Sequence, residues 1–259
     1  MSDSEKDRNG ILAESQLAQL QRDGFLVLKN FVSAGDTDQI RDLLDGLFDG
    51  FSGIDPQHTY DLGSGRKGHS DNRTPSIRDT VTLVPKLAQT EIFERACAVS
   101  RQLFRRPVER LWDAAVFKSP HSNSETPWHQ DEGVYQFESS TKPVASAFFW
   151  LALQPTTKVN GCMSYIPASH LGGVLPHHRR HQKSGAVALE AEGVDLSQAV
   201  VCPLDAGDVS IHLPRTLHHT GPNTTDDVRK AWVLQIGCPR WPRMLRRIKR
   251  AAQHAVGRG

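Results

Sequence analysis

The sequence predicts a mainly β protein, an antiparallel barrel or sandwich with helices packed on its outside. Within residues 1–238, helical periodicity is confined to the front, up to about residue 104. Short apolar runs bounded by turn residues follow it, between residues 111 and 237. With 259 residues the chain can bury a substantial core. We therefore expect one domain over 1–238, with a helical front at 11–104 and a barrel at 108–238.

Two helices and a short strand are expected first. A helix with leucines three residues apart should end at Asp23-Gly24, a typical helix terminus. The apolar run FLVL at 25–28 then predicts a strand. The segment SAGDTDQIRDLLDGLFDGF at 33–51 places its apolar residues on one helical face, and Asp36 is the expected cap.

Two polar segments are expected to be loops. Residues 52–79 are rich in Gly, Ser, Asp, Pro and charge, which predicts a lid or a binding loop. Residues 171–198 are interpreted in the same way, including HHRRH at 177–181, because adjacent histidines point in different directions. Residues 87–104 predict a helix. The strands expected after it are 111–117, 144–153, 162–166, 199–203, 208–213 and 230–237.

Composition narrows the class of protein. No apolar run reaches the roughly 18 to 20 residues of a membrane span, and MSDSEKDRNG lacks the apolar core of a signal peptide. Four scattered cysteines without a CxxC pair argue against disulfides and a zinc site. We expect a cytoplasmic protein, monomeric or homodimeric. Residues 239–259 hold seven basic residues and no acid, and are expected to form a solvated, helical tail rather than a nucleic-acid site.

Two stretches point to metal chemistry. In PWHQDEGVY at 127–135, an extended backbone would turn His129 and Asp131 to the same face, with Gln130 on the other side. The stretch 214–235 holds a histidine pair, a Gly-Pro-Asn turn and Arg229. Two histidines and one carboxylate form the ligand set of non-haem Fe(II) oxygenases, which leaves metal positions open. Arg229 is a fixed cation suited to a carboxylate.

Six phrases together make the pattern specific. They are QRDGFLVLKNFVS (21–33), FKSP (117–120), WHQD (128–131), NGCMSYIPASH (160–170), DAGDVSIH (205–212) and HHTGPNTTDDVR (218–229). With these phrases, the chain resembles the phytanoyl-CoA dioxygenase family of Fe(II)- and 2-oxoglutarate-dependent oxygenases over about residues 11–238. The resemblance implies a double-stranded β-helix, a cupin-like jelly-roll barrel, with N-terminal helices packed outside.

The resemblance implies a role for each matching residue. The family places an arginine eleven positions after its metal-binding histidine, which selects His218 and turns His219 away from the metal. Fe(II) would then be bound by His129, Asp131 and His218.

The resemblance also implies the residues that hold the cosubstrate. Arg229 and Thr220 would bind the distal carboxylate of 2-oxoglutarate. Trp150 would form part of the wall of that pocket, and Lys118 would lie close to it.

The implied activity is oxidation of an unactivated C–H bond by O2, with release of succinate and CO2. Related halogenases have a small residue in place of the aspartate, so Asp131 favours hydroxylation. Desaturation, cyclisation and endoperoxide formation remain open. The expected substrate is a small metabolite of specialised metabolism. The alternative interpretations are a non-catalytic binding protein of the same fold and a zinc hydrolase, which would have no use for Arg229.

Overall fold

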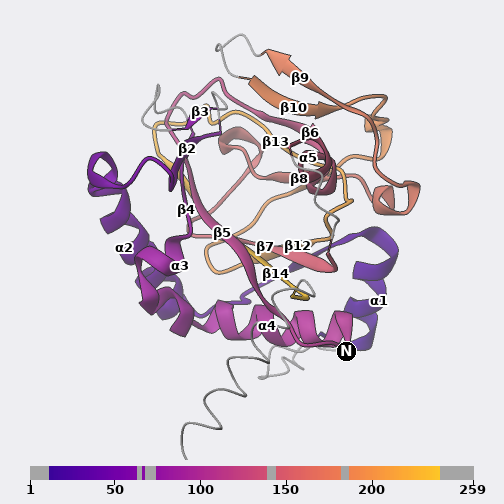
Figure 1. Ribbon diagram of the computed structural model, residues 1–259, viewed down its shortest axis with the longest axis horizontal. Helices are drawn as coiled ribbons and strands as arrows, with labels where there is room; N and C mark the ends of the chain where they lie inside the picture. The colour runs from indigo at the N-terminus through magenta and orange to yellow at the C-terminus, as the bar shows by residue number, and fades with distance from the viewer. Residues whose placement is uncertain (1–11, 63–65, 68–73, 139–143, 182–186, 240–259) are drawn as a thin grey trace, which may run out of the picture.

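The computed structural model describes residues 12–62, 66–67, 74–138, 144–181 and 187–239. Two antiparallel sheets pack against each other, and helices cover the outer side of the larger sheet (Figure 1). Among the described helices, none is both long and apolar enough to cross a membrane. The basic tail lies outside the described residues apart from Pro239, so its expected helix stays a prediction, as does the division at residue 238.

The larger, major sheet has the order β1-β12-β7-β14-β5-β4-β2-β3, and the minor sheet has the order β11-β8-β13-β6. The strands of the major sheet, in that order, are Phe25–Leu28, Val209–His212, Ser146–Ala152, Arg229–Gly237, Glu109–Lys118, Pro75–Arg78, Thr59–Asp61 and Arg66–Lys67. Those of the minor sheet are Val200–Cys202, Met163–Tyr165, His218–Thr220 and Thr126–His129.

Strands β5 to β8 and β11 to β14 build the barrel. Along the chain, β5 and β7 join the major sheet, and β6 and β8 join the minor one. The second half follows the reverse order, since β11 and β13 lie in the minor sheet and β12 and β14 in the major one. A chain that crosses repeatedly between two antiparallel sheets is a double-stranded β-helix, which confirms the predicted fold class. A separate hairpin joins β9 (His177–His181) to β10 (Val187–Ala191).

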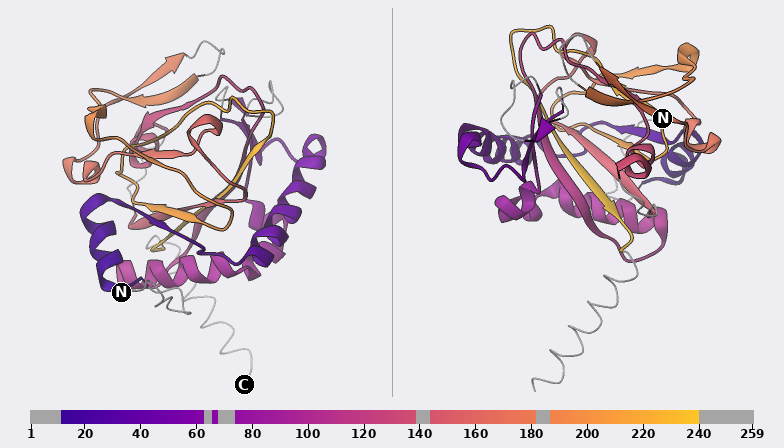
Figure 2. Two further views of the ribbon diagram at one scale, coloured as in Figure 1. Left: turned by 180° about the vertical axis from the view of Figure 1, so that it is seen from behind. Right: turned by 45° about the horizontal axis from the view of Figure 1, so that its top comes forward.

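The longer helices pack on the outer face of the major sheet (Figure 2). Gly24 ends α1 in a left-handed conformation, at φ 81°. Ser33 caps α2 by accepting a hydrogen bond from the backbone N–H of Asp36, so the expected cap at Asp36 is wrong by one turn. The helices are α1 (Glu14–Asp23), α2 (Ala34–Asp49), α3 (Thr80–Leu83), α4 (Glu91–Phe104) and α5 (Asp131–Glu138). The 3-10 turns are η1 (Phe51–Gly53), η2 (Pro85–Gln89), η3 (Lys158–Asn160), η4 (Ser169–Gly172) and η5 (Leu196–Gln198).

Alternation along the strands creates two apolar cores. On β5, Ala115 and Phe117 join the helices in the outer core, whereas Ala114 and Val116 face the barrel interior. The inner core brings residues of the major sheet together with Tyr165 and others of the minor sheet. The barrel interior therefore lies between the two sheets, and side chains from both sheets can meet there.

The two expected loops contain strands. Residues 52–79 supply β2, β3 and β4, which extend the major sheet beyond β5. Residues 171–198 supply the hairpin β9–β10, which contacts β6. The expectation of loops was wrong in both segments for the same reason. Their strands are short and rich in polar residues, so they are stabilised by pairing and tertiary contacts rather than by an apolar pattern of their own.

Candidate metal and cosubstrate site

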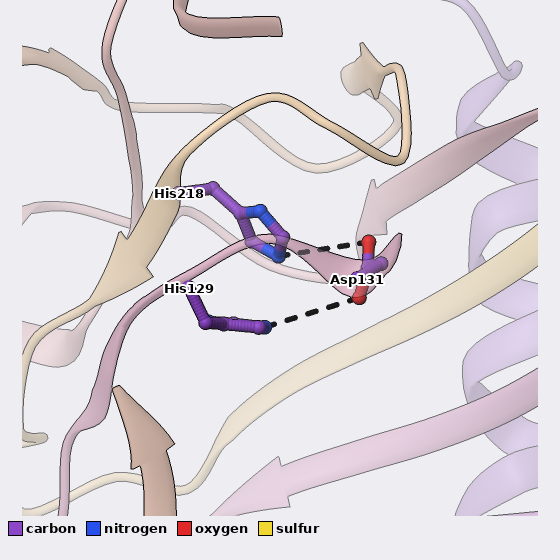
Figure 3. A group of neighbouring side chains, drawn as sticks. All are labelled: His129, Asp131 and His218. Atoms are coloured by element: carbon purple, nitrogen blue, oxygen red, sulfur yellow. Dashed lines mark ion pairs between the residues drawn. The ribbon is translucent and has the colours of Figure 1, made fainter. Parts of the chain in front are cut away.

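Three side chains meet inside the barrel with the composition of a metal site. Ligand atoms of His129, Asp131 and His218 all lie within 4.8 Å of one another. His129 Nε2 lies 3.9 Å from Asp131 Oδ1, and His218 Nε2 lies 3.8 Å from Asp131 Oδ2. Figure 3 shows both imidazoles turned toward the carboxylate from neighbouring segments. Two nitrogen donors and one carboxylate fit a divalent iron-type ion with open positions.

Backbone pairing sets the two histidines side by side. His218 on β13 is the direct partner of His129 on β6, and their ring centroids are 4.1 Å apart. Asp131 reaches the site in another way than expected, because β6 ends at His129 and Asp131 is the first residue of α5. The shared face of His129 and Asp131 therefore comes from a strand-to-helix junction, and an extended segment is the wrong description.

Both imidazoles are held in the form that a metal needs. His129 Nδ1 lies 2.8 Å from the carbonyl of Pro127, and His218 Nδ1 lies 2.9 Å from that of Thr216. A carbonyl oxygen can only accept, so each Nδ1 carries the hydrogen and each Nε2 keeps a lone pair facing the site. Burial lowers the pKa of both histidines, that of His218 to well below its usual value. Both rings are therefore neutral near pH 7 and free to bind a cation.

Asp131 has the complementary protonation state. Burial alone would raise the pKa of its carboxyl group, but His218, His212 and His129 together lower it to about 2. The site therefore presents one negative charge and two neutral nitrogen donors. That donor set fits a divalent cation.

A second group of side chains forms a cationic site next to the triad. Arg229 on β14 is the direct strand partner of Lys118 on β5, and both are buried. Lys118 Nζ donates to Thr220 Oγ1 at 3.1 Å and to the carbonyl of Gly221 at 2.6 Å. The Arg229 guanidinium lies over the ring of Trp150, 5.3 Å from its centroid. All four residues that the resemblance assigned to a cosubstrate pocket are thus brought together.

These two cations fit an anionic ligand. In the described part of the chain, no carboxylate lies within ion-pair distance of either one, and Arg229 Nε is buried without a hydrogen-bond partner. Burial lowers the pKa of Arg229 to about 10, and burial together with Arg229 lowers that of Lys118 well below its usual value. Unpaired buried charges are costly, so their presence here indicates a place for a carboxylate ligand.

His219 is turned away from the triad, as the alternation of β13 requires. Its ring stacks on Trp128, with centroids 5.2 Å apart, and its Nε2 lies 3.3 Å from Glu125 Oε2. His219 therefore belongs to the outer side of the minor sheet, and of the pair only His218 faces the candidate metal site.

Three residues next to the triad were missed by sequence reasoning. His212 lies 3.2 Å from Asp131 Oδ2, measured from its Nε2. The Gln130 side chain bonds to three backbone groups of the loops around it, those of Gly173, Leu175 and Arg215. His177 lies on strand β9 rather than in the expected loop, and its Nε2 accepts a hydrogen bond from the backbone N–H of Gln130. No spacing in the sequence links these residues, which only the fold brings together.

Known proteins of similar sequence and structure identify the family. The family described as "Phytanoyl-CoA dioxygenase (PhyH)" matches residues 20–231. The chain belongs to the phytanoyl-CoA dioxygenase family. This is a family of Fe(II)- and 2-oxoglutarate-dependent dioxygenases, so the predicted family and enzyme class are confirmed.

Individual members of the phytanoyl-CoA dioxygenase family cover most of the chain. The peroxisomal phytanoyl-CoA dioxygenase of Rattus norvegicus is 26% identical over 238 residues, which are 86% of this chain and 68% of that protein. The structure of EvdO2 from Micromonospora carbonacea var. aurantiaca is 29% identical, covers 88% of this chain and 92% of its own, and superposes with a TM-score of 0.74. EvdO2 in complex with 2-oxoglutarate superposes with a TM-score of 0.73 at 26% identity.

Proposed function

We propose that the protein is an Fe(II)- and 2-oxoglutarate-dependent dioxygenase that hydroxylates an unactivated C–H bond of a small metabolite. The observation that carries the proposal is the pairing of two sites in one barrel. His218, one member of the two-histidine, one-carboxylate cluster, lies on the same strand, β13, as Thr220, whose hydroxyl contacts the buried cation Lys118. His218 and Thr220 are two residues apart on β13, about 7 Å along a strand, which suits a five-carbon dicarboxylate that reaches from one site to the other.

Each residue has a role in this proposal. His129, Asp131 and His218 hold Fe(II). Arg229, with Lys118 and Thr220 beside it, holds the distal carboxylate of 2-oxoglutarate, and two fixed cations give that end of the cosubstrate its orientation.

Trp150 lies under the Arg229 guanidinium and fixes the plane in which Arg229 offers its donors. When bound, Fe(II) and 2-oxoglutarate supply the activation of O2 for C–H oxidation, with succinate and CO2 as coproducts. The chain supplies position, charge and exclusion of water. Asp131 keeps a carboxylate in the ligand set, which supports hydroxylation rather than halogenation.

The inner wall beside the triad supports a substrate with an apolar or ring-shaped part. A cross-strand row on the inner face runs from His212 through Phe148 and Gln235 to Trp112, and His212 itself contacts Asp131. Tyr135 on α5 donates to Gln235 at 3.0 Å. Aromatic side chains with one amide among them suit a small organic molecule, and a metabolite of specialised metabolism is the class that we propose. A cytoplasmic location and a monomer or homodimer remain our predictions.

An anaerobic titration tests this function. Apo-protein is titrated with Fe(II) and then 2-oxoglutarate, and the weak visible charge-transfer band of the chelate is followed. We expect the band in the wild type and its loss in His218→Ala. His178→Ala is the matched control, because His178 lies on β9, is half exposed and pairs with Glu190 and Glu192.

The other outcomes contradict the proposal in different ways. Iron binding without the band would retain the metal site but remove the assigned roles of Arg229 and Lys118. Failure to bind either iron or 2-oxoglutarate would favour the alternative, a binding protein of the same fold that has lost catalysis. Asp131→Gly should abolish hydroxylation, and normal activity in that variant would exclude Asp131 as a ligand.

A further inference from the structure

His212 is a buried histidine beside the triad that has no role in the proposed ligand set. It ends β12, has a relative exposure of 2%, and its Nε2 lies 3.2 Å from Asp131 Oδ2. Among the described residues, the ligand atoms that all lie within 4.8 Å of one another belong to His129, Asp131 and His218. His212 is not part of this cluster but is a neighbour of it. It contacts the metal site only through the carboxylate of Asp131 and by ring contact with His218.

The hydrogen-bond partners of His212 determine which of its nitrogens carries the hydrogen. An ionised carboxylate only accepts, so His212 Nε2 must donate to Asp131. In a neutral imidazole Nδ1 is then the acceptor, and the hydroxyl of Tyr165 lies 3.3 Å from it. The Tyr165 hydroxyl also lies 2.8 Å from Ser210 Oγ, which can supply the next hydrogen. The result is one directed chain, from Ser210 through Tyr165 and His212 to Asp131.

Ring packing leaves the imidazole of His212 little freedom. Phe148, its direct partner on β7, stacks on it with centroids 5.1 Å apart and planes within 8°. His218 lies on another side, with a centroid distance of 4.4 Å. Tyr165 is itself fixed by Phe25, whose ring stacks on it at 4.6 Å. A histidine clamped in this way can orient a carboxylate more strictly than a mobile donor could.

We propose that His212 is a positioning residue, which holds the Asp131 carboxylate in the orientation that binds the metal. The inference rests on the proposed function, because it takes Asp131 as a metal ligand. Asp131 is the first residue of α5, directly after the β6–α5 junction, and its carboxylate could rotate if nothing tied it. The donor from His212 occupies one lone pair of Oδ2 and fixes the plane of the carboxylate, so the ligand set is assembled before a metal arrives. The chain through Tyr165 and Ser210 keeps His212 in the donating tautomer.

Three substitutions separate this role from packing. His212→Phe keeps an aromatic ring against Phe148 but removes the donor. His212→Gln loses the ring but offers an N–H donor at a similar reach. Tyr165→Phe keeps the inner core and removes only the hydroxyl that fixes the tautomer of His212.

The measurement is Fe(II) affinity of the anaerobic apo-protein, with the thermal unfolding midpoint of each apo variant measured beside it. Loss of an outer partner of a metal ligand typically costs tenfold to hundredfold in metal affinity, so we expect a loss of about that size in His212→Phe. His212→Gln should stay within about threefold of the wild type, and Tyr165→Phe should fall between the two. If His212 served only to pack against Phe148, His212→Phe would keep the Fe(II) affinity better than His212→Gln, because Phe is the better match for the stacked ring. A higher Fe(II) affinity in His212→Gln therefore indicates the hydrogen bond to Asp131.

Several results would overturn the inference. One is wild-type affinity in His212→Phe. Another is equal loss in the Phe and Gln variants, which would make His212 a core residue. If His212→Phe does not fold, the comparison of His212→Gln with Tyr165→Phe decides, and a Gln variant weaker than the Tyr165 variant contradicts the role. A wild-type protein that binds no Fe(II) would remove the proposed function, and this inference with it. By contrast, a wild type that binds Fe(II), together with an unaffected His212→Phe, removes this inference alone.

Discussion

Arg229 and Lys118 are paired directly across β14 and β5, and both are buried. Within the described residues neither has a carboxylate partner at ion-pair distance. Two cations in contact with an apolar interior repel each other and lose their hydration, so they destabilise the protein that contains them. The presence of these two buried cations is explained if a dianionic ligand binds beside them and neutralises their charge. This relationship leads to two predictions.

Arg229→Met should separate cosubstrate binding from metal binding. We expect affinity for 2-oxoglutarate to fall by at least about a hundredfold, because a charge-assisted carboxylate pair is lost, while Fe(II) affinity stays within about threefold. The apo-protein should become more stable, by about 1–3 kcal/mol, because replacing an uncompensated buried charge with an apolar side chain is often stabilising. Calorimetric titration and chemical unfolding measure the two effects.

Lys230→Met is the matched control for Arg229→Met. Lys230 is the next residue of β14 but faces the other way, where it pairs with Asp45 at 2.7 Å on the helical side of the sheet. Its loss should leave 2-oxoglutarate affinity unchanged. Equal loss of Fe(II) and 2-oxoglutarate affinity in Arg229→Met would show that Arg229 supports the whole site and does not hold the cosubstrate.

Lys118 predicts a pH effect whose sign follows from its burial. Folding lowers the pKa of Lys118, through burial and then through Arg229, so the folded protein holds fewer protons than the unfolded chain between that lowered pKa and about 10.4. Stability should therefore rise with pH in this window. A bound carboxylate restores the pKa, so 2-oxoglutarate should bind with proton uptake there. Titration in buffers of different ionisation enthalpy measures the uptake, which Lys118→Met should abolish; the same uptake in that variant would assign it to another group.

The candidate site could be proposed from the sequence because its residues stand in short phrases. WHQD indicates a histidine and a carboxylate that could share a metal, Arg229 follows a histidine pair as a cation, and the turn residues between strands predict the barrel. The choice of His218 over His219 and the roles of Thr220, Trp150 and Lys118 came from the resemblance, and the fold places Trp150 and Lys118 beside Arg229. What connects these residues in space is strand pairing between distant parts of the sequence, such as His129 with His218 and Lys118 with Arg229.

The remainder depends on tertiary contacts that leave no local pattern. His212 ends a strand like many others, and only the crossing of β12 toward α5 brings it to Asp131. The sequence did not predict helix α5, because Gly133 lies within it and the motif around His129 and Asp131 is compatible with a strand. Strands β2, β3 and β4 have few apolar residues and are stabilised by pairing with β5 and with one another. The sequence therefore indicates candidate ligands more readily than the residues that support them.

Gly161→Ala should weaken cosubstrate binding through the backbone. Gly161 has φ 82°, and a Cβ there would lie 2.5 Å from the carbonyl oxygen of Gly221, the atom that accepts a hydrogen bond from Lys118. We expect a stability loss of about 1–3 kcal/mol from strain, and a clear drop in 2-oxoglutarate affinity because that carbonyl must move. Gly193→Ala is matched in backbone conformation, with φ 69° and nothing within 4 Å, so it should show strain without loss of affinity. Similar affinities in the two variants would contradict the proposed link.

Gly133→Ala should destabilise a helix that alanine would otherwise favour. Gly133 lies inside α5, where helix propensity alone predicts a gain of about 0.5–1 kcal/mol. A Cβ at this position, however, would lie 2.1 Å from His177 Cε1, and His177 is the residue that accepts from the backbone N–H of Gln130. Displacing that ring should loosen the backbone between His129 and Asp131, and so lower both stability and Fe(II) affinity.

Gly46→Ala provides the matched comparison for Gly133→Ala. Gly46 lies inside α2, and a Cβ there would meet nothing within 4 Å, so the same substitution should stabilise the protein by about 0.5–1 kcal/mol. Chemical unfolding and Fe(II) titration of the two variants give opposite signs for stability if His177 packs on α5 as the structure has it. A stabilised Gly133→Ala protein with unchanged Fe(II) affinity would mean that the β9 segment does not brace the junction that carries His129 and Asp131.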